Sequence, residues 1–465
     1  MQTIKAEHPE YRDRKLTLQM YEDLYVGGQQ LKNGVSSYLT RRQKEPMDVY
    51  SERASRVFYE NYIGSIIDWF AATLFRREPR VTYECGDDSA RSFINLFTDD
   101  CDRKGKSLSE MFRQSLIDTL VYGSSYLLVD FPRTQWTPGN RAEEELTGAS
   151  RAYLVGYRPT EVTNWSHDET GNLEWVVTRT QNLRQEDLAR GRRVQETRWT
   201  YYDKKNFQSY KQVQGVGEEA PIRRTEGGPH ALAAQERVPL FELTVPKGLW
   251  LMNKAALLQL EHFNKSNALS WALTMGLFAS PVIYTDREFD QIVGESYYIQ
   301  LGPGDRFGWT EPEGKVFQIA ADNLRRLQEE IYRVCYLLTQ AGGPSSHAAQ
   351  SGLSKQRDFA ITHEVLRAYG DSVKSTMKSI LQAISMARDD KAQVDVAGLD
   401  EFDIGDFTTD LGDAERLLGL GIDSPTLKKQ VFKKLATKYL CDIRQEVKDR
   451  IEDEIERAVD ATTEE

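Results

Sequence analysis

The sequence predicts an α+β protein in which long helices and an antiparallel β unit occupy separate stretches of the chain. After residue 253, apolar residues recur at spacings of three and four in long segments, which is the spacing of amphipathic helices. Between residues 152 and 214, apolar and polar residues alternate in several short runs, as in half-buried strands. With 465 residues and 40% hydrophobic content, the chain can bury real cores, and we expect two to four domains.

The N-terminal region is predicted to be largely helical. Residues 10–26 suggest a charged amphipathic helix, and a broad apolar face from Tyr50 to Leu74 predicts another. Ser107 is expected to be an N-cap, with Glu110 completing a capping box. This helix should break at Gly123 and lead into the strand SYLLVDF.

The antiparallel β unit is predicted from the segments AYLVGYRP, EWVVTRTQN, TRWTYYD and SYKQVQG. Its aromatic residues alternate with arginines, which is superficially similar to a stacking platform for single-stranded nucleic acid. The aromatic residues expected to point inward are Tyr153, Trp165, Trp175, Trp199 and Tyr201. Because neighbouring strand residues point to opposite faces, we expect the aromatic rings in the core and the arginines in solvent.

Two long helices are expected to enclose a β-rich insert. The first spans Asn253 to Ala279, about 40 Å, and its polar middle at residues 264–267 should face polar surroundings or another copy of the chain. Short strands separated by Gly-Pro turns are then predicted from the segments VIYT, YYIQL and KVFQI. Because GPGDRFG lies between two of these strands, it is expected to be a turn and not a dinucleotide fingerprint. The second helix runs from Ala320 to Gln340 and ends at Gly342-Gly343-Pro344.

The segment SSHAAQSG has no packing face and is expected to be an exposed, mobile loop. A helix from Ser354 to Asp390, about 55 Å long, should follow, with Gly370 as a natural place for a kink. Short strand-like pieces come next. Ser424 as N-cap and Pro425 as first helical residue predict a further helix near the C-terminus.

The order of helix, β insert, helix, loop and very long helix resembles the portal proteins of tailed bacteriophages. Three motifs near the N-terminus are similar to the start of one portal subgroup. They are an aromatic residue with a Glu-Arg pair at residues 50–53, the Tyr-X-Asn motif Tyr59-Glu60-Asn61, and Phe75-Arg76-Arg77-Glu78-Pro79. The C-terminal stretch resembles the portal crown, although Asp423-Ser424-Pro425 stands where Ser with Glu or Lys is commoner.

This resemblance implies a portal fold and a ring, usually a homododecamer, that serves as head-tail connector and DNA channel in viral genome packaging and ejection. The implied divisions are a wing (1–245), a first stem helix (246–280), a small α/β clip (281–319), a second stem helix (320–341), a channel loop (342–354), a long kinked wing helix with return strands (355–410) and a crown (411–465). The implied partners are other copies of the chain, double-stranded DNA, the terminase large subunit, a head-tail adaptor and the major capsid protein. The implied location is the virion, at a capsid vertex, after synthesis in the host cytoplasm.

The resemblance also suggests two groups of functional residues. Side chains of the channel loop that would face DNA are Ser345, Ser346, His347, Gln350, Ser351, Ser354 and Lys355. Clip residues that would dock partners are Asp286, Arg287, Glu288, Arg306, Trp309 and Glu311.

The sequence offers no catalytic, cofactor or metal site, so we expect no enzyme. No GxxxxGK[ST] motif occurs, the six histidines lack metal-ligand spacing, and the four cysteines suggest reduced thiols. No signal peptide or membrane segment is expected. The net charge of −11 argues against a DNA-coating protein but not against a channel in which DNA slides. The alternatives are a metal-dependent prophage nuclease, which would need converging carboxylates such as Asp99, Asp100 and Asp102, or another minor virion protein.

Overall fold

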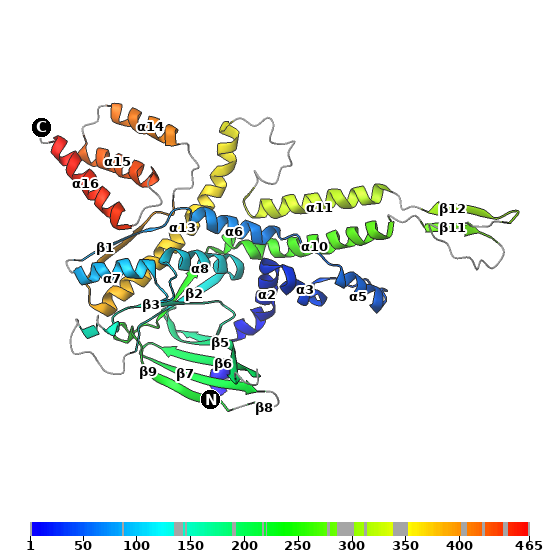
Figure 1. Ribbon diagram of the computed structural model, residues 1–465, viewed down its shortest axis with the longest axis horizontal. Helices are drawn as coiled ribbons and strands as arrows, with labels where there is room; N and C mark the ends of the chain where they lie inside the picture. The colour runs from blue at the N-terminus through cyan, green and yellow to red at the C-terminus, as the bar shows by residue number, and fades with distance from the viewer. Residues whose placement is uncertain are drawn as a thin grey trace. The chain divides into compact units, whose positions relative to one another are not determined.

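The computed structural model describes residues 2–85, 88–133, 143–144, 147–187, 192–215, 218–219, 221–276, 280–285, 302–310, 314–337, 352–400, 407–420, 424–439 and 445–463. Within them the predicted α+β class is confirmed, because helices occur together with sheets whose strand pairs are all antiparallel, and most strands follow one another in the chain. Figure 1 shows these elements in chain order.

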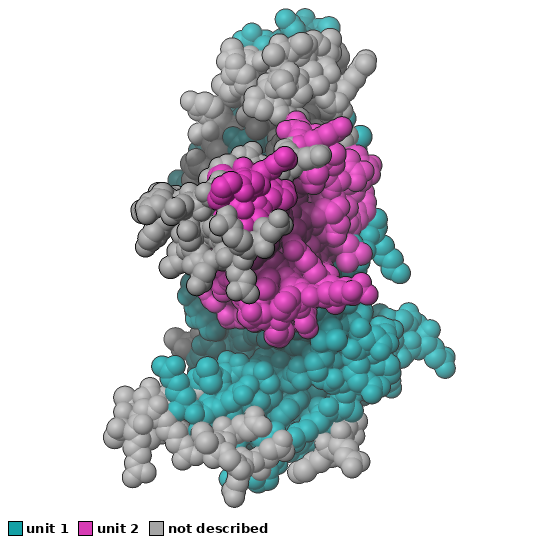
Figure 2. Space-filling view, turned by 90° about the vertical axis from the view of Figure 1, so that its right-hand side faces the viewer, with its two compact units in different colours: residues 1–21, 67–253, 359–465 teal, residues 22–66, 254–358 magenta. Residues whose placement is uncertain are grey.

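The chain divides into two compact units, drawn in different colours in Figure 2. Unit 1 comprises residues 1–21, 67–253 and 359–465, and unit 2 comprises residues 22–66 and 254–358. Both units are therefore assembled from stretches that are far apart in the sequence.

Unit 1 contains most of the helices outside the long pair. They are α1 (Gln2–Lys5), the first part of α2 (Pro9–Val26), most of α6 (Tyr62–Leu74), α7 (Asp88–Asp99), α8 (Leu108–Tyr122), most of α13 (Gly352–Arg388), α14 (Phe407–Gly419), α15 (Pro425–Tyr439) and α16 (Gln445–Thr463). The predicted start of α15 is confirmed, since Ser424 Oγ accepts a hydrogen bond from Leu427 N at 3.3 Å.

Helix α8 follows its sequence signals closely. Ser107 Oγ accepts a hydrogen bond from Glu110 N at 3.2 Å, which confirms the N-cap. The Glu110 carboxylate binds Arg113 at 2.7 Å, so only the Ser107 half of the capping box has formed. Gly123 ends the helix with φ of 92°, a conformation that glycine adopts without strain.

Three sheets lie in unit 1. The strands are β1 (Arg80–Glu84), β2 (Ser124–Asp130), β3 (Tyr153–Tyr157), β4 (Val162–His167), β5 (Leu173–Asp187), β6 (Arg192–Asp203), β7 (Asn206–Gly215), β8 (Glu218–Glu219), β9 (Arg223–Pro229), β10 (Leu240–Thr244) and β13 (Gln393–Ala397). One sheet has the order β10-β2-β3, another has β4-β5-β6-β7-β8 with β9 also on β7, and β1 pairs with β13. The strand expected after the long helix is therefore β13.

The sequence predicted that the aromatic residues of the β unit share one inward face. They lie on two faces instead. Trp165 packs beside a cluster that includes Val176 and Tyr202, whereas Trp175 and Tyr201 pack beside a second cluster of Ile4, Val177 and Trp199. Val176 pairs with Tyr202 and Val177 with Tyr201, so the two clusters occupy opposite faces of one sheet. Ile4 of α1 helps to cover the second face, a contact that no local pattern indicates.

Helix α13 buries the stripe that its periodicity predicts, and Tyr369, Val373, Met377 and Ile380 are each fully buried. Gly370, where the sequence favours a kink, has a packing role. A Cβ atom there would lie 2.2 Å from the carbonyl oxygen of Leu399, so glycine permits close approach of the chain after β13.

Unit 2 contains the end of α2, α3 (Gly28–Asn33), α4 (Val35–Tyr38), α5 (Met47–Ser55), the start of α6, most of α10 (Leu251–Gly276), β11 (Ser280–Tyr284), β12 (Arg306–Thr310), α11 (Gly314–Val334) and the start of α13. The single helix expected between Tyr50 and Leu74 is wrong, because α5 and α6 are separate. Side chains of α10 form hydrogen bonds with the backbone of their connection, as described below.

Helix α11 corrects two further predictions. KVFQI is helical and not a strand, since a five-residue apolar run fits either structure and only its neighbours decide. The helix also ends at Val334 and not at Gln340. Tyr336 adopts a left-handed φ of 63°, and Leu337 N donates to Tyr332 O at 2.9 Å, which closes the helix without glycine.

Candidate assembly and DNA-contact site

The candidate site is the helical hairpin of unit 2, formed by α10, β11, β12 and α11. Lys254 of α10 bonds the Tyr336 hydroxyl just beyond the C-terminal end of α11, and Lys265 Nζ donates to Asn323 Oδ1 at 3.0 Å further along. Ser280 of β11 pairs with Thr310 of β12, and Tyr284 pairs with Arg306. One antiparallel register thus runs through helices and strands, and Figure 1 shows the two helices side by side.

The loop before β12 is the predicted turn. Gly302 N donates to Asp305 Oδ2 at 2.7 Å, and Asp305 N donates to Gly302 O at 3.1 Å. Gly304 has φ of 100°, which few other residues tolerate. The interpretation of GPGDRFG as a turn is confirmed, because its backbone groups are used within the loop.

Three amide side chains of α10 bind backbone groups of residues 38–63. Gln259 accepts from Ile63 N at 3.2 Å and donates to Glu60 O at 2.7 Å. The amide of Asn264 joins Thr40 N and Tyr38 O, at 2.8 and 3.0 Å. Asn267 binds both the N–H and the C=O of Phe58, at 3.1 and 2.9 Å. Each amide thereby satisfies one backbone N–H and one backbone C=O outside its own helix.

These contacts show what two of the residues in the polar middle of α10 face, namely backbone groups of the same chain. Ser266 and Asn267 are buried, and Asn264 is half-buried, within a single chain. The side chains of Asn264 and Asn267 bond backbone groups 200 or more residues away in sequence. Lys265, in contrast, is exposed and pairs with Glu261. Sequence spacing reports polarity but not the identity of a distant partner.

Two residues of the Tyr-X-Asn motif connect α2 with α6. Tyr59 Oη donates to Leu24 O and Asn61 Nδ2 to Tyr25 O, both at 2.7 Å, so they satisfy carbonyls in the last turn of α2. Asn61 Oδ1 also accepts from Gly64 N at 2.9 Å, in the first turn of α6. The motif therefore joins one helix end to one helix start.

A buried ion pair organises the loop before α5. Arg53 Nε and Nη2 each donate to the Glu45 carboxylate at 2.9 Å, and both side chains are at most 4% exposed. Hydrogen bonding from Arg53 is the main cause that holds the pKa of Glu45 below its usual range, against the opposing effect of burial. Arg53 also donates to Thr40 O at 2.8 Å, beside the Asn264 contact.

His262 lies at a junction of three segments. Its ring meets Tyr62 edge-to-face at 5.1 Å, and Tyr62 meets Tyr332 of α11 in the same manner. Burial lowers the pKa of His262, while the nearby Glu60 partly opposes that shift. Burial, followed by the charge of Glu60, raises the pKa of Tyr62 to about 12. The neutral forms of both rings are thus favoured at the base of the hairpin.

The hairpin also exposes apolar side chains and balances its charges locally. Large apolar residues exposed along it are Leu257, Leu273, Tyr284, Phe307, Val316 and Ile319. Lys265 pairs with Glu261, Arg325 with Asp322 and Arg333 with Glu330, each within one helix. The surface therefore offers apolar contact area while these cations are neutralised by neighbours.

Only some predicted site residues lie in the part that the structure describes. Ser345, Ser346, His347, Gln350 and Ser351 of the channel loop lie outside it, as do Asp286, Arg287, Glu288 and Glu311 of the clip. Ser354 and Lys355 belong to the first turn of α13. Arg306, which is exposed, and Trp309 belong to β12. The DNA-facing and docking roles of all these residues remain proposals.

Acidic residues considered for a nuclease have a structural role. Asp100 accepts from Gly105 N and Asp102 from Lys104 N, both at 2.8 Å, which shapes the loop between α7 and α8. The Gly105 hydrogen bond is the main cause that lowers the pKa of Asp100, and Arg151 reinforces it. Among the described residues, no group of three His, Cys, Asp or Glu side chains is arranged to hold a metal ion. None of the described helices is long and apolar enough to cross a membrane.

No protein-family model matches the sequence, and no curated protein matches it. Chains in three solved structures are similar to this one at 14% identity. In a virion of a native gene transfer agent (GTA) particle, the match covers 84% of this chain and 94% of that chain, with a TM-score of 0.43. In the neck of an empty GTA particle computed with C6 symmetry, it covers 87% and 98%, with a TM-score of 0.44. In the neck of a native GTA particle computed with C12 symmetry, it covers 86% and 96%, with a TM-score of 0.41.

Proposed function

We propose that this chain is the subunit of a portal ring, a non-enzymatic conduit for double-stranded DNA at one vertex of a virion capsid. The stem of the ring would consist of α10 and α11, and the clip would include β11 and β12. The residues between α11 and α13 would form the channel loop, and α14 to α16 the crown. The ring would contact the major capsid protein, the terminase large subunit and, later, a head-tail adaptor.

The observation that supports the proposal best is the continuous hairpin of unit 2. Its exposed apolar residues, with Leu257 at 71% and Val316 at 63%, have too few partners within one chain. A heterologous contact between identical copies would cover them, and such a contact closes into a ring when the rotation between subunits allows it. The very long α13, which follows the hairpin in sequence, completes the order of elements expected for a portal.

The direct test is the size and shape of the purified protein. We expect an assembly of several hundred kilodaltons or more on a sizing column with light scattering, and rings with a central channel in negative-stain images. Leu257→Lys and Val316→Lys together should reduce the assembly to smaller species, because they place charges in the proposed contact. Leu16→Lys, at an exposed apolar residue of α2 outside the hairpin, is the matched control. A wild-type protein that stays monomeric or dimeric at all concentrations would refute the ring.

The clip assignment is tested by shortening the hairpin tip. Replacing residues 286–301 by a short Gly-Ser linker keeps β11, β12 and the turn at Gly302 intact. The ring should still assemble, while pull-down of the terminase large subunit and of the adaptor should weaken. Unchanged affinity for both partners would show that the clip lies elsewhere.

A further inference from the structure

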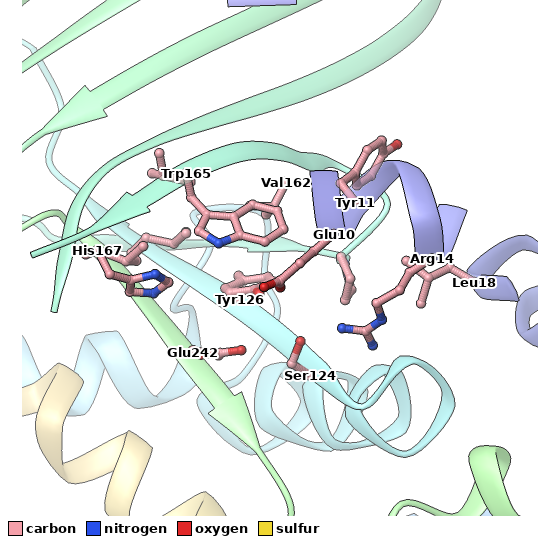
Figure 3. Close-up of a pocket in the computed structure, with 14 residues that line it drawn as sticks. Glu10, Tyr11, Arg14, Leu18, Ser124, Tyr126, Val162, Trp165, His167 and Glu242 are labelled. Atoms are coloured by element: carbon pink, nitrogen blue, oxygen red, sulfur yellow. The ribbon is translucent and has the colours of Figure 1, made fainter. Parts of the chain in front are cut away.

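A cavity of about 180 Å³ is lined entirely by residues of unit 1 (Figure 3). It is lined by α2 on one side, β2 and β10 on another, and β4 and β5 on the third. Sites for drug-sized ligands usually have about 300 to 1,000 Å³. This cavity is therefore suited to a single side chain or an equally small molecule.

The walls of the cavity are apolar and aromatic. Val162, Val176 and Leu240 are buried residues that line it, and the Trp165 and Tyr126 rings lie beside them. The Trp165 ring is held by stacking on His8, with the ring centroids 4.1 Å apart. A hydrocarbon chain would be sheltered there against a fixed indole ring.

Two carboxyl groups give the cavity its polarity. Figure 3 shows Glu10 extending from α2 and Glu242 from β10 toward the same space. Within the described residues, neither carboxylate forms an ion pair with a Lys, Arg or His side chain. Although Glu242 as a whole is exposed at the sheet edge, desolvation around its carboxyl group raises its pKa. Hydrogen bonds from Tyr126 and Ser124, and then the charges of His167 and Arg14, only partly oppose this rise.

The other charged groups at the cavity do not neutralise this pair fully. The Arg14 guanidinium lines the cavity but lies 5.6 Å from the Trp250 ring centroid and donates to Tyr122 O at 3.4 Å. His167 of β4 also faces the site. Two carboxylates thus oppose one guanidinium that other groups engage, and a second cation would be favoured between Glu10 and Glu242.

We propose that this cavity binds a primary alkylammonium group, either of a free aliphatic amine or of a lysine side chain from another protein. The hydrocarbon part would lie against Trp165 and Leu240. The ammonium group has three N–H donors and no acceptor, so it can donate to Glu242 and Glu10 together. The aromatic rings add attraction for a cation placed over their faces.

The first experiment compares n-butylammonium with n-butanol, a neutral molecule of similar size, by calorimetric titration of the full chain. We expect n-butylammonium to bind at least tenfold more tightly, because only the cation can pair with the carboxylates. Equal affinity for the two probes, or no binding of n-butylammonium, would overturn the proposal.

Variants locate the site. Glu242→Gln keeps the size and one acceptor oxygen of the side chain but removes its charge, and it should weaken n-butylammonium binding about tenfold. Glu236→Gln is the matched control, since Glu236 is exposed and pairs with Lys205 outside the cavity. If Glu242→Gln does not fold, Glu10→Gln on the exposed side of α2 tests the same charge. Full affinity in a folded variant of either glutamate would overturn the proposal.

A last comparison distinguishes the two sources of the amine. Lysine capped as its N-acetyl and N-methylamide derivative represents a side chain of another protein, and 1,5-diaminopentane represents a free amine. Binding of the capped lysine favours a protein partner, while its exclusion with binding of the diamine favours a free amine. Failure of both probes to bind would refute an alkylammonium site.

Discussion

Gly64 has no room for a side chain at the start of α6. A Cβ atom there would lie 2.6 Å from Asn61 Nδ2 and 2.8 Å from Tyr25 O, so the two hydrogen bonds of Asn61 would have to shift. We expect Gly64→Ala to destabilise the protein by about 1–3 kcal/mol, the usual cost of overpacking. Urea denaturation measures this change.

Gly308→Ala is the control for that substitution, since nothing lies within 4 Å of a Cβ atom at this site in the same unit. Its midpoint of denaturation should remain close to that of the wild type. A Gly64→Ala protein that is as stable as Gly308→Ala would mean that the Asn61 contacts are dispensable.

The Glu45–Arg53 pair predicts a pH-dependent effect. Arg53→Met leaves a buried carboxylate unpaired, which should cost about 3 kcal/mol at neutral pH. In the wild type the pKa of Glu45 is lowered, so its contribution is complete above the usual pKa of a glutamate and is lost as pH falls through the folded value. In the variant, burial without Arg53 favours the protonated form, so the stability difference should narrow between pH 7 and pH 4.

Urea midpoints of both proteins across that pH range check the prediction. Arg56→Met is the control, because Arg56 and Glu52 form an exposed pair whose loss should change stability by less than about 1 kcal/mol. A constant difference between wild type and Arg53→Met from pH 7 to pH 4 would contradict the role of the buried pair.

Helix α10 holds the α5–α6 connection through side-chain amides, and Asn267 provides the sharpest test. Asn267→Leu keeps the volume but leaves the N–H and C=O of Phe58 unpaired, at a cost of about 1–3 kcal/mol. Hydrogen exchange measured by mass spectrometry should be faster in the peptide of residues 56–61. Ser270→Ala, at an exposed residue of the same helix, should leave both stability and exchange unchanged. Unaltered exchange in Asn267→Leu would show that the Asn267 amide does not hold the α5–α6 connection in place.

If the proposed channel loop contacts DNA, a change in the loop should affect DNA packaging without affecting assembly of the ring. Deleting residues 346–350 should leave the ring assembled but impair packaging or retention of DNA, because the loop would no longer reach the DNA in the channel. Virion yield and genome length measure the effect, with a deletion of residues 137–141 as a control of equal length in another expected loop. Normal yield with full-length genomes would show that this loop is not the part of the channel that contacts DNA.

Local patterns predicted most helices and strands, and distant contacts account for the errors. Signals within a few residues were enough to predict the Ser107 cap, the end of α8 at Gly123 and the buried stripe of α13. The break between α5 and α6 depends on Asn267, which lies 209 residues from its partner Phe58. The end of α11 at Val334 lacks the usual glycine, since Tyr336 takes the left-handed conformation there. The cavity near Glu242 joins five elements, so no single stretch of sequence indicates it.

The charge of the whole molecule predicts weak affinity for DNA. The chain has a net charge of −11, and cations of the hairpin such as Arg325 and Arg333 are paired with acids on the same helix. A ring of such subunits would repel phosphates along much of its surface. Binding of a duplex fragment should therefore be weak even at low salt in a mobility-shift assay. A tight complex that weakens steeply with salt would contradict a channel in which DNA slides.

The shared register of α10, β11, β12 and α11 constrains how this chain can vary among its relatives. Lys254 meets Tyr336, and Ser280 meets Thr310, so an insertion in one arm alone would offset every contact beyond it. An added turn of about 3.6 residues in α10 needs an equal addition in α11, and each matched pair lengthens the hairpin by about 5.4 Å. Among homologous sequences, we therefore expect insertions and deletions in the two arms to occur together and to be of equal length.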